Sequence, residues 1–159
     1  MNFQEGEVLL VDKPYGWTSF DVVNKLRWNL KRALKVKKIK VGHAGTLDPL
    51  ATGLLIICTG KQTKNVETYM AEEKTYTGTF LLGKTTPSFD LETEYNETFD
   101  IDHITPELIN QVAEGFLGEQ TQTAPVYSAK QIDGKRAYLF ARAGKTISPV
   151  SGKEVKKDE

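Results

Sequence analysis

One aspartate stands in a sequence context that could do chemistry. Asp48 lies within residues 42–53, whose sequence is GHAGTLDPLATG. The glycines permit close backbone approach, and Pro49 restricts Asp48 to an extended backbone, so that the main chain aims its side chain. An aimed carboxylate is what a catalytic acid, base or nucleophile requires. An Asp-Pro pair that caps or stabilises a loop fits the same residues equally well, so the residues alone leave both interpretations open.

A second pattern has the spelling of a phosphate-binding loop. Residues 78–85, GTFLLGKT, match GxxxxGK[ST]. That loop works because its backbone amides curl round phosphates and a helix begins at the lysine. Here the four variable residues are predicted to belong to an apolar strand, and Pro87 follows Thr85 without a helical pattern. We therefore interpret the segment as a strand that ends in a turn, and not as a nucleotide site.

The elements around Asp48 can be predicted from periodicity. Residues 7–12 (EVLLVD) are typical of a short buried strand, which the turn-forming residues 13–16 end. Thr18 is predicted to be a helix N-cap, with Asp21 three residues later, and apolar residues at three- and four-residue spacing predict a helix over 19–34. Residues 41–53 show no period and are predicted to be a loop. This loop directly precedes a strongly apolar strand at 54–59.

The second half of the chain also mixes helices and strands. We expect a helix over 62–71, a strand over 76–82, turns through the acidic residues 84–104, and a helix begun by Thr105-Pro106 and ended by Gly118. Beyond these we expect extended chain over 121–132, a turn at 133–134, a short helix over 137–142 and a polar tail. The pattern predicts an α+β fold, a mixed but mainly antiparallel sheet flanked by helices, in one domain over residues 1–159.

Composition narrows the class of protein. The 159 residues are 39% hydrophobic and 26% charged, as in a soluble globular protein, and no apolar run approaches the roughly 20 residues that span a bilayer. One cysteine and the absence of a signal-like N-terminus favour a cytoplasmic protein. The 21 basic residues equal the 21 acidic ones, so net charge does not indicate nucleic-acid binding. Residues 25–40, however, hold bases and no acid, and could present a basic face to a phosphate backbone.

Four blocks in order carry a family resemblance. GHAGTLDPLATG resembles the signature loop of the TruB family of tRNA pseudouridine synthases, in which the essential aspartate takes the position of Asp48. VDKPYGWTS at 11–19 resembles the family's first motif, a structural segment that supports the active-site loop, and KTY at 74–76 resembles its Lys-x-Tyr. Residues 125–129 with 134–138 are similar to the mobile thumb that grips RNA. The resemblance covers nearly the whole chain.

The resemblance implies a reaction and a set of residues. It implies a pseudouridine synthase catalytic fold, here incomplete and truncated at its C-terminal side, with residues 121–150 as the thumb-like segment. It implies a monomer that isomerises a T-loop uridine (uridine-55) in the T-arm of tRNA, with Asp48 as the catalytic carboxylate and no cofactor or metal. His43 would occupy the space that the flipped nucleotide leaves, and Tyr76 would stack on the target base. A loop-stabilising hydrogen bond for His43 and a core position for Tyr76 remain the alternatives. Candidate phosphate contacts are Lys13, Lys130, Lys135 and Arg136, together with Arg142 and Lys145.

The family pattern also contains a segment that this sequence lacks. Family members carry, beyond the thumb, an arginine that pairs with the catalytic aspartate. A neighbouring cation keeps a carboxylate in an apolar pocket ionised. The alternative function is therefore a catalytically silent RNA-binding module, or an inactive fragment that retains the fold.

Overall fold

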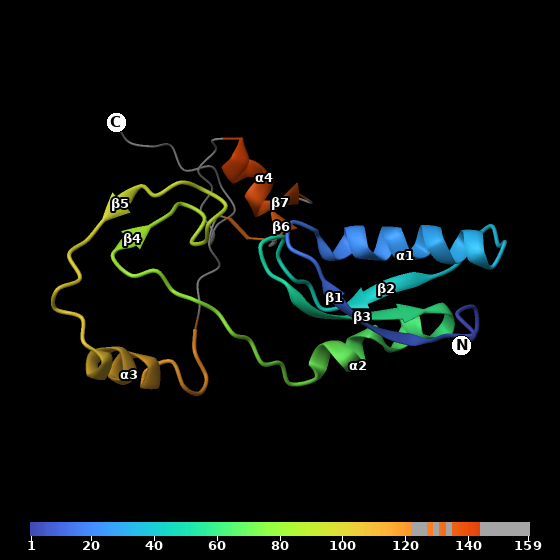
Figure 1. The fold of residues 1–159 in the computed structure, drawn as a ribbon, viewed down its shortest axis with the longest axis horizontal. Helices are drawn as coiled ribbons and strands as arrows, with labels where there is room; N and C mark the ends of the chain where they lie inside the picture. The colour runs from blue at the N-terminus through green and yellow to red at the C-terminus, as the bar shows by residue number, and fades with distance from the viewer. Residues whose placement is uncertain (122–126, 129–130, 133–134, 144–159) are drawn as a thin grey trace. The chain divides into compact units, whose positions relative to one another are not determined.

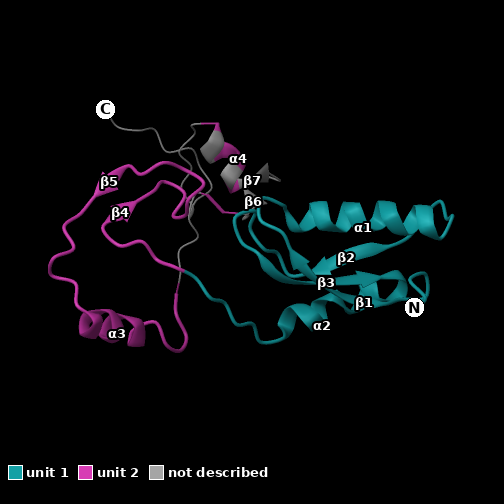
Figure 2. Ribbon diagram, in the orientation of Figure 1, with its two compact units in different colours: residues 1–78 teal, residues 79–159 magenta. Residues whose placement is uncertain are grey.

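The structure is a computed structural model that describes residues 1–121, 127–128, 131–132 and 135–143. These residues belong to two compact units, residues 1–78 and residues 79–159, shown in separate colours in Figure 2. The predicted α+β class is confirmed, because helices and antiparallel strands occur together in both units.

The first unit is built on a three-stranded antiparallel sheet (Figure 1). Its strands are β1 (Val8–Lys13), β2 (Val41–Ala44) and β3 (Gly53–Thr59), in the order β1-β3-β2. Val8 pairs with Cys58 and Lys13 with Gly53 in one ladder, and Val41 pairs with Thr59 in the other. The start of β3 therefore lies beside the end of β1.

Helix α1 (Ser19–Ala33) covers one face of this sheet. It begins as predicted, because the Thr18 side chain accepts a hydrogen bond from the Asp21 amide while the Asp21 carboxylate accepts one from the Thr18 amide. Val22 and Val23 of α1 are buried against side chains of the sheet. The shared core consists of Val22, Val23, Val41, Leu55 and Ile57, with Leu9, Val11, Leu26, Leu30 and Ile39 packed at its edge. Burial of these side chains fixes where the helix lies on the sheet.

At the end of β3 that contains Thr59, the chain packs closely against residues 4–7. The 3-10 helix η1 (Gly60–Asn65) and helix α2 (Val66–Ala71) follow β3, where a single helix over 62–71 was expected. The hydroxyl of Thr59, which is fully buried, accepts a hydrogen bond from the Glu7 amide at 3.0 Å and donates to the Glu7 carbonyl at 3.4 Å. Gly60 has a φ of 51°, and a Cβ there would lie 2.3 Å from the Gln4 carbonyl oxygen. Glycine is therefore the residue that allows this closure.

The second unit contains shorter elements. Strands β4 (Lys84–Thr85) and β5 (Glu97–Thr98) form one antiparallel pair, and β6 (Gln131–Ile132) and β7 (Lys135–Arg136) form another. Helix α3 (Pro106–Glu114) begins at the predicted N-cap, Thr105, whose side chain accepts a hydrogen bond from the Leu108 amide. Helix α4 (Ala137–Arg142) confirms the short helix predicted there. Within the described ranges, no helix is both long and apolar enough to cross a membrane.

Several sequence-based predictions were wrong in detail. Residues 41–44 form strand β2, although the whole of 41–53 was predicted to be a loop, because pairing with β3 compensates for the weak strand propensity of Gly42 and His43. Residues 76–82 form no strand, since no described strand pairs with them. Helix α3 ends at Gly115 and not at Gly118.

One face of the sheet is more exposed than the sequence predicted. Strand β1 is not wholly buried: Leu10 on β1 is 71% exposed, and Leu54 on the neighbouring β3 is 63% exposed. Both belong to the face of the sheet opposite the α1 core, because their side chains alternate with those of Val11 and Leu55. The extended segment over 121–132 and the turn at 133–134 lie largely outside the described residues, as does the polar tail.

Candidate active site

The connection between β2 and β3 holds the candidate catalytic carboxylate. We call residues 45–52 the Asp48 loop. Within it the Asp48 carbonyl accepts a hydrogen bond from the Ala51 amide at 3.0 Å, which closes a tight turn with Pro49 in its second position. The Asp48 side chain is exposed, and among the described residues its carboxylate has no hydrogen-bond or ion-pair partner. The carboxylate is thus free to meet a ligand.

The residue before Asp48 is held by the start of helix α1. The Leu47 amide donates a hydrogen bond to the Ser19 hydroxyl oxygen at 2.9 Å, and the same hydroxyl donates to the Leu47 carbonyl at 3.2 Å. Ser19 is 2% exposed and is the first residue of the helix. A buried side chain therefore holds both backbone polar groups of Leu47.

The residue after Asp48 is held by the turn that follows β1. The Pro49 carbonyl accepts a hydrogen bond from the Gly16 amide at 2.8 Å, and the Lys13 ammonium lies 3.5 Å from the same oxygen. Gly16 has a φ of 79°, which favours glycine and lets its amide point at Pro49. The segment that resembles the family's first motif thus contacts the Asp48 loop on both sides of Asp48.

Lys13 does not lie on the surface, where a residue that contacts phosphate has to be. Its side chain is fully buried, and its ammonium donates to the carbonyls of Trp17 at 2.7 Å and Pro14 at 3.2 Å. From the sequence, Lys13 was a candidate phosphate contact, with an ordinary solvated charge as the alternative. A buried ammonium group needs such hydrogen-bond acceptors, and here backbone carbonyls supply them. Lys13 therefore braces the loop and is not available to RNA.

His43 lies on β2, five residues before Asp48, and its side chain is half-buried. Its Nδ1 is hydrogen-bonded to the Gly45 carbonyl. Since a carbonyl can only accept, Nδ1 carries a proton. In the neutral ring, the other nitrogen, Nε2, is then an acceptor. The loop-stabilising hydrogen bond considered from the sequence is therefore present, and it fixes the orientation of the imidazole next to the Asp48 loop.

Tyr76 follows α2 in an irregular segment and is 70% exposed, so it is not a core aromatic residue. No hydrogen bond joins it to the Asp48 loop among the described residues. Its neighbour Lys74 donates to the carbonyls of Met70 and Glu72, each at 2.6 Å. These contacts place a cation at the C-terminal end of α2, where it interacts favourably with the helix dipole. Lys74 thereby caps the C-terminal end of α2, two residues before Tyr76.

The remaining predicted contacts lie in the second unit. Lys135 and Arg136 form strand β7, which pairs with β6 in a two-stranded ribbon. Arg142 is the last residue of α4. Lys130 and Lys145 lie outside the described residues.

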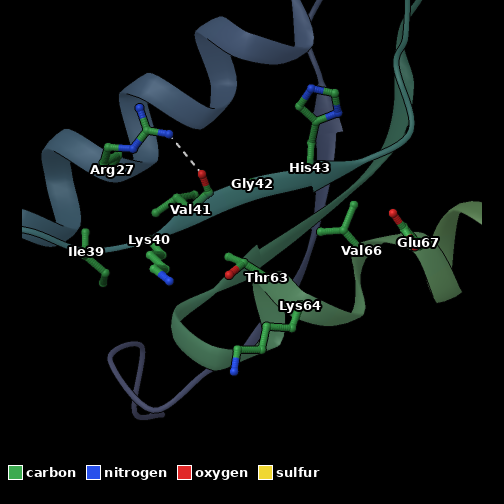
Figure 3. A pocket seen from close by; sticks show the side chains of 10 residues that line it. All are labelled: Arg27, Ile39, Lys40, Val41, Gly42, His43, Thr63, Lys64, Val66 and Glu67. Atoms are coloured by element: carbon green, nitrogen blue, oxygen red, sulfur yellow. Dashed lines mark hydrogen bonds between the residues drawn. The ribbon is translucent and has the colours of Figure 1, made fainter.

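A groove beside β2 contains cations that the candidate set did not include. It is bordered by α1, β2, η1 and α2, and on one side of it Arg27 of α1 donates a hydrogen bond to the Val41 carbonyl of β2 at 2.9 Å (Figure 3). Lys40 and Lys64 also line the groove, and Glu67 is the acidic residue in its lining. The groove is lined by Arg27, Ile39, Lys40, Val41, Gly42, His43, Thr63, Lys64, Val66 and Glu67. In the sequence, the acid-free run 25–40 indicated Arg27 and Lys40 of this set, and nothing indicated Lys64.

Comparison with known proteins identifies the family to which this arrangement belongs. The sequence model described as "TruB family pseudouridylate synthase (N terminal domain)" matches residues 31–156. The chain belongs to the TruB family. The matched region includes the Asp48 loop and β3, whereas β1 and most of α1 precede it.

Curated TruB-family proteins match over most of the chain. A tRNA pseudouridine synthase B of Phocaeicola vulgatus is 58% identical over 147 residues, which are 92% of this chain and 63% of that protein. The tRNA pseudouridine synthase B of Parabacteroides distasonis is 54% identical with the same coverage. That of Flavobacterium johnsoniae is 53% identical over 152 residues, 95% of this chain and 66% of its own length. The chain thus spans about 63% of the length of the first two relatives.

Proposed function

We propose that this chain is the catalytic region of a tRNA pseudouridine synthase, with Asp48 as the carboxylate that acts on the ribose of a T-loop uridine, uridine-55. The observation that carries the proposal is the Asp48 loop. Its carboxylate is exposed and unpaired among the described residues, while hydrogen bonds hold the backbone on both sides of it. The names of relatives at 53–58% identity support the reaction and the substrate.

The proposed reaction is an isomerisation that needs no cofactor. The bond between C1′ and N1 of uridine breaks, the freed uracil rotates, and a bond forms between C1′ and C5. The proton on C5 leaves and N1 regains one, so atoms and charge balance. Asp48 acts either as a nucleophile at C1′ or as a base that assists elimination. Because the base must leave the stack to be reached, the enzyme has to offset a cost of a few kcal/mol.

The proposed partner is the T-arm of tRNA, bound by a monomer. His43 would fill the space that the flipped nucleotide vacates, and the exposed ring of Tyr76 would stack on the target base, a contact that contributes about 1–3 kcal/mol. The groove with Arg27, Lys40 and Lys64 offers positive charge for the phosphate backbone. Residues 121–150, with Lys130, Lys135 and Arg136, would form the thumb-like segment that grips RNA. The single cysteine fits a reducing compartment such as the cytoplasm.

One observation favours a second candidate, a catalytically silent RNA-binding module. Among the described residues no cation forms an ion pair with the Asp48 carboxylate that would orient it. A chain with the fold and the basic groove but without such a partner could bind RNA and leave it unchanged. Activity and binding therefore have to be measured separately.

The experiment measures tritium release from tRNA transcripts labelled at C5 of uridine, together with binding of the same transcripts by filter retention. Wild type is compared with Asp48→Asn, and with Asp102→Asn as a control for loss of one exposed acidic charge in the run 90–102. We expect Asp48→Asn to lower the rate of release by at least about a thousandfold with unchanged binding, because it removes the reacting group. The Asp102→Asn variant should match wild type.

The outcomes separate the two candidates. If wild type binds tRNA and releases no tritium, the proposed activity is wrong and the RNA-binding module remains. If Asp48→Asn releases tritium as fast as wild type, Asp48 is not the catalytic carboxylate. If wild type does not bind tRNA at all, both candidates are refuted for this chain.

A further inference from the structure

Ser19 makes an unusual pair of contacts for a serine at the start of a helix. Its hydroxyl accepts from the Leu47 amide at 2.9 Å and donates to the Leu47 carbonyl at 3.2 Å. The helix itself does not need this hydroxyl, because Thr18 is the N-cap and forms the capping box with Asp21. The Ser19 side chain is thus available to hold a segment that is 28 residues away in the sequence.

The segment that Ser19 holds leads directly into Asp48. Leu47 and Asp48 share a peptide unit, so fixing the polar groups of Leu47 fixes the direction from which the Asp48 side chain departs. On the other side, the Pro49 carbonyl is held by the Gly16 amide at 2.8 Å. The Asp48 carboxylate itself has no partner among the described residues. Its position therefore depends on the backbone contacts that flank it.

We infer that Ser19 is a positioning residue for Asp48, which it aims by holding both backbone polar groups of Leu47. This inference rests on the proposed function, because it assigns Ser19 a role in the reaction that Asp48 would perform. Reacting groups must be held within a fraction of an ångström of the productive geometry, and a misplacement of about 1 Å can lower a rate about a hundredfold. Serine fits this role because it is small enough for a site that is 2% exposed and still carries a group that both donates and accepts.

The variant Ser19→Ala removes the two contacts and little else. Alanine keeps Cβ and has a high helix propensity, and the Thr18–Asp21 capping box remains, so helix α1 should still form. The Leu47 amide and carbonyl then lose their partner, and the loop can relax toward solvent. The expected defect is a misdirected Asp48 in a folded protein.

The first unit offers a matched control at its opposite end. The Thr59 hydroxyl makes the same pair of contacts with the backbone of Glu7, and Thr59 is also buried. It lies at the end of β3 away from Gly53, about 20 Å from the start of that strand at the usual rise per residue. The variant Thr59→Val removes the two contacts while keeping the shape of the side chain. The Glu7 carbonyl keeps the Thr59 amide as a donor at 2.9 Å, so the Glu7 amide is the group that loses its partner. Thr59→Val therefore controls for the loss of a buried hydroxyl contact far from Asp48.

The test combines a structural and a kinetic measurement on the chain. Hydrogen exchange of the Leu47 amide should become at least about tenfold faster in Ser19→Ala than in wild type or Thr59→Val, because the hydrogen bond that protects it is gone. With C5-tritiated tRNA, kcat should fall about 10- to 100-fold in Ser19→Ala with KM within about twofold of wild type. Thr59→Val should keep both parameters within about twofold of wild type, although it unfolds at a lower temperature.

Three results would overturn the inference. The first is a kcat for Ser19→Ala no lower than that of Thr59→Val, and the second is a raised KM at unchanged kcat, which would indicate a binding role. The third is unchanged exchange at Leu47, which would show that the contact does not hold the loop. A wild-type chain that releases no tritium would refute the proposed function, and the catalytic role of Ser19 with it. The exchange rates would still show whether Ser19 holds Leu47.

Discussion

The buried ammonium of Lys13 allows a quantitative test of how the first unit supports the Asp48 loop. In the variant Lys13→Met the aliphatic stem is replaced by one of similar length, so that packing is kept and only the donor is lost. Three carbonyls lose a contact, those of Pro14, Trp17 and Pro49. Pro49 keeps the Gly16 amide and Pro14 keeps the Trp17 amide at 3.4 Å. The Trp17 carbonyl has no other donor among the described residues.

The expected loss of stability follows from these contacts. A buried polar group that loses its partner costs about 1–3 kcal/mol, and the shortest bond, 2.7 Å to Trp17, is the one that is not replaced. The variant also no longer buries a charge, which offsets part of that cost. We therefore expect the free energy of unfolding to fall by about 1–2 kcal/mol. With a urea dependence of about 1–2 kcal/mol per molar, the unfolding midpoint should move down by about 1 M.

Urea unfolding followed by tryptophan fluorescence measures this change, because both tryptophans, Trp17 and Trp28, belong to the first unit. The control is Lys61→Met, which removes an ammonium from an exposed ion pair with Glu5. Exposed pairs contribute about 0–1 kcal/mol, so its midpoint should move by less than half as much. A Lys13→Met midpoint equal to or above that of wild type would refute the assignment of Lys13 as a brace.

Two further predictions concern titratable groups of the first unit. The hydrogen bond from the Thr18 hydroxyl, and then that from the Thr18 amide, hold the pKa of the Asp21 carboxyl below its usual 3.8. This stabilisation is present above pH 3.8 and is lost as the pH falls through the lowered pKa, so the melting temperature of Asp21→Asn should fall less steeply below pH 4 than that of wild type. Equal slopes by circular dichroism would contradict it. Burial raises the pKa of the Cys58 thiol and shields it from reagents. A disulfide reagent at pH 8 should therefore modify Cys58 in the folded protein at least about a hundredfold more slowly than in the urea-unfolded chain. Similar rates would show that β3 is accessible.

Local signals in the sequence predicted the start of the fold well. The Thr18–Asp21 pair and the apolar spacing that follows predicted α1 almost to the residue, because capping and amphipathic periodicity are properties of neighbouring residues. The apolar run after Gly53 likewise predicted β3. Strand β2 could not be predicted, because its formation depends on pairing with β3 and not on its own residues.

The site shows the same division between local and distant causes. Pro49 indicated a constrained Asp48, and the structure contains the turn that it favours. The contacts that support the loop come from Ser19, Gly16 and Lys13, which are about 30 residues earlier in the chain, and spacing alone does not show which side chain turns inward. Lys13 was therefore predicted to be a surface residue. Its burial depends on carbonyl acceptors that only the folded turn brings together.

The strand order β1-β3-β2 determines when the Asp48 loop can form during synthesis. The central strand, β3, is the last of the three in the sequence, and its pairing of Val8 with Cys58 joins residues 50 positions apart. While β3 is still inside the ribosome, neither edge strand has a partner to pair with. Closing so long a segment carries an entropic cost before any contact compensates for it. Asp48 is thus synthesised before the sheet that will orient it can exist, and its loop becomes ordered only after translation has passed β3.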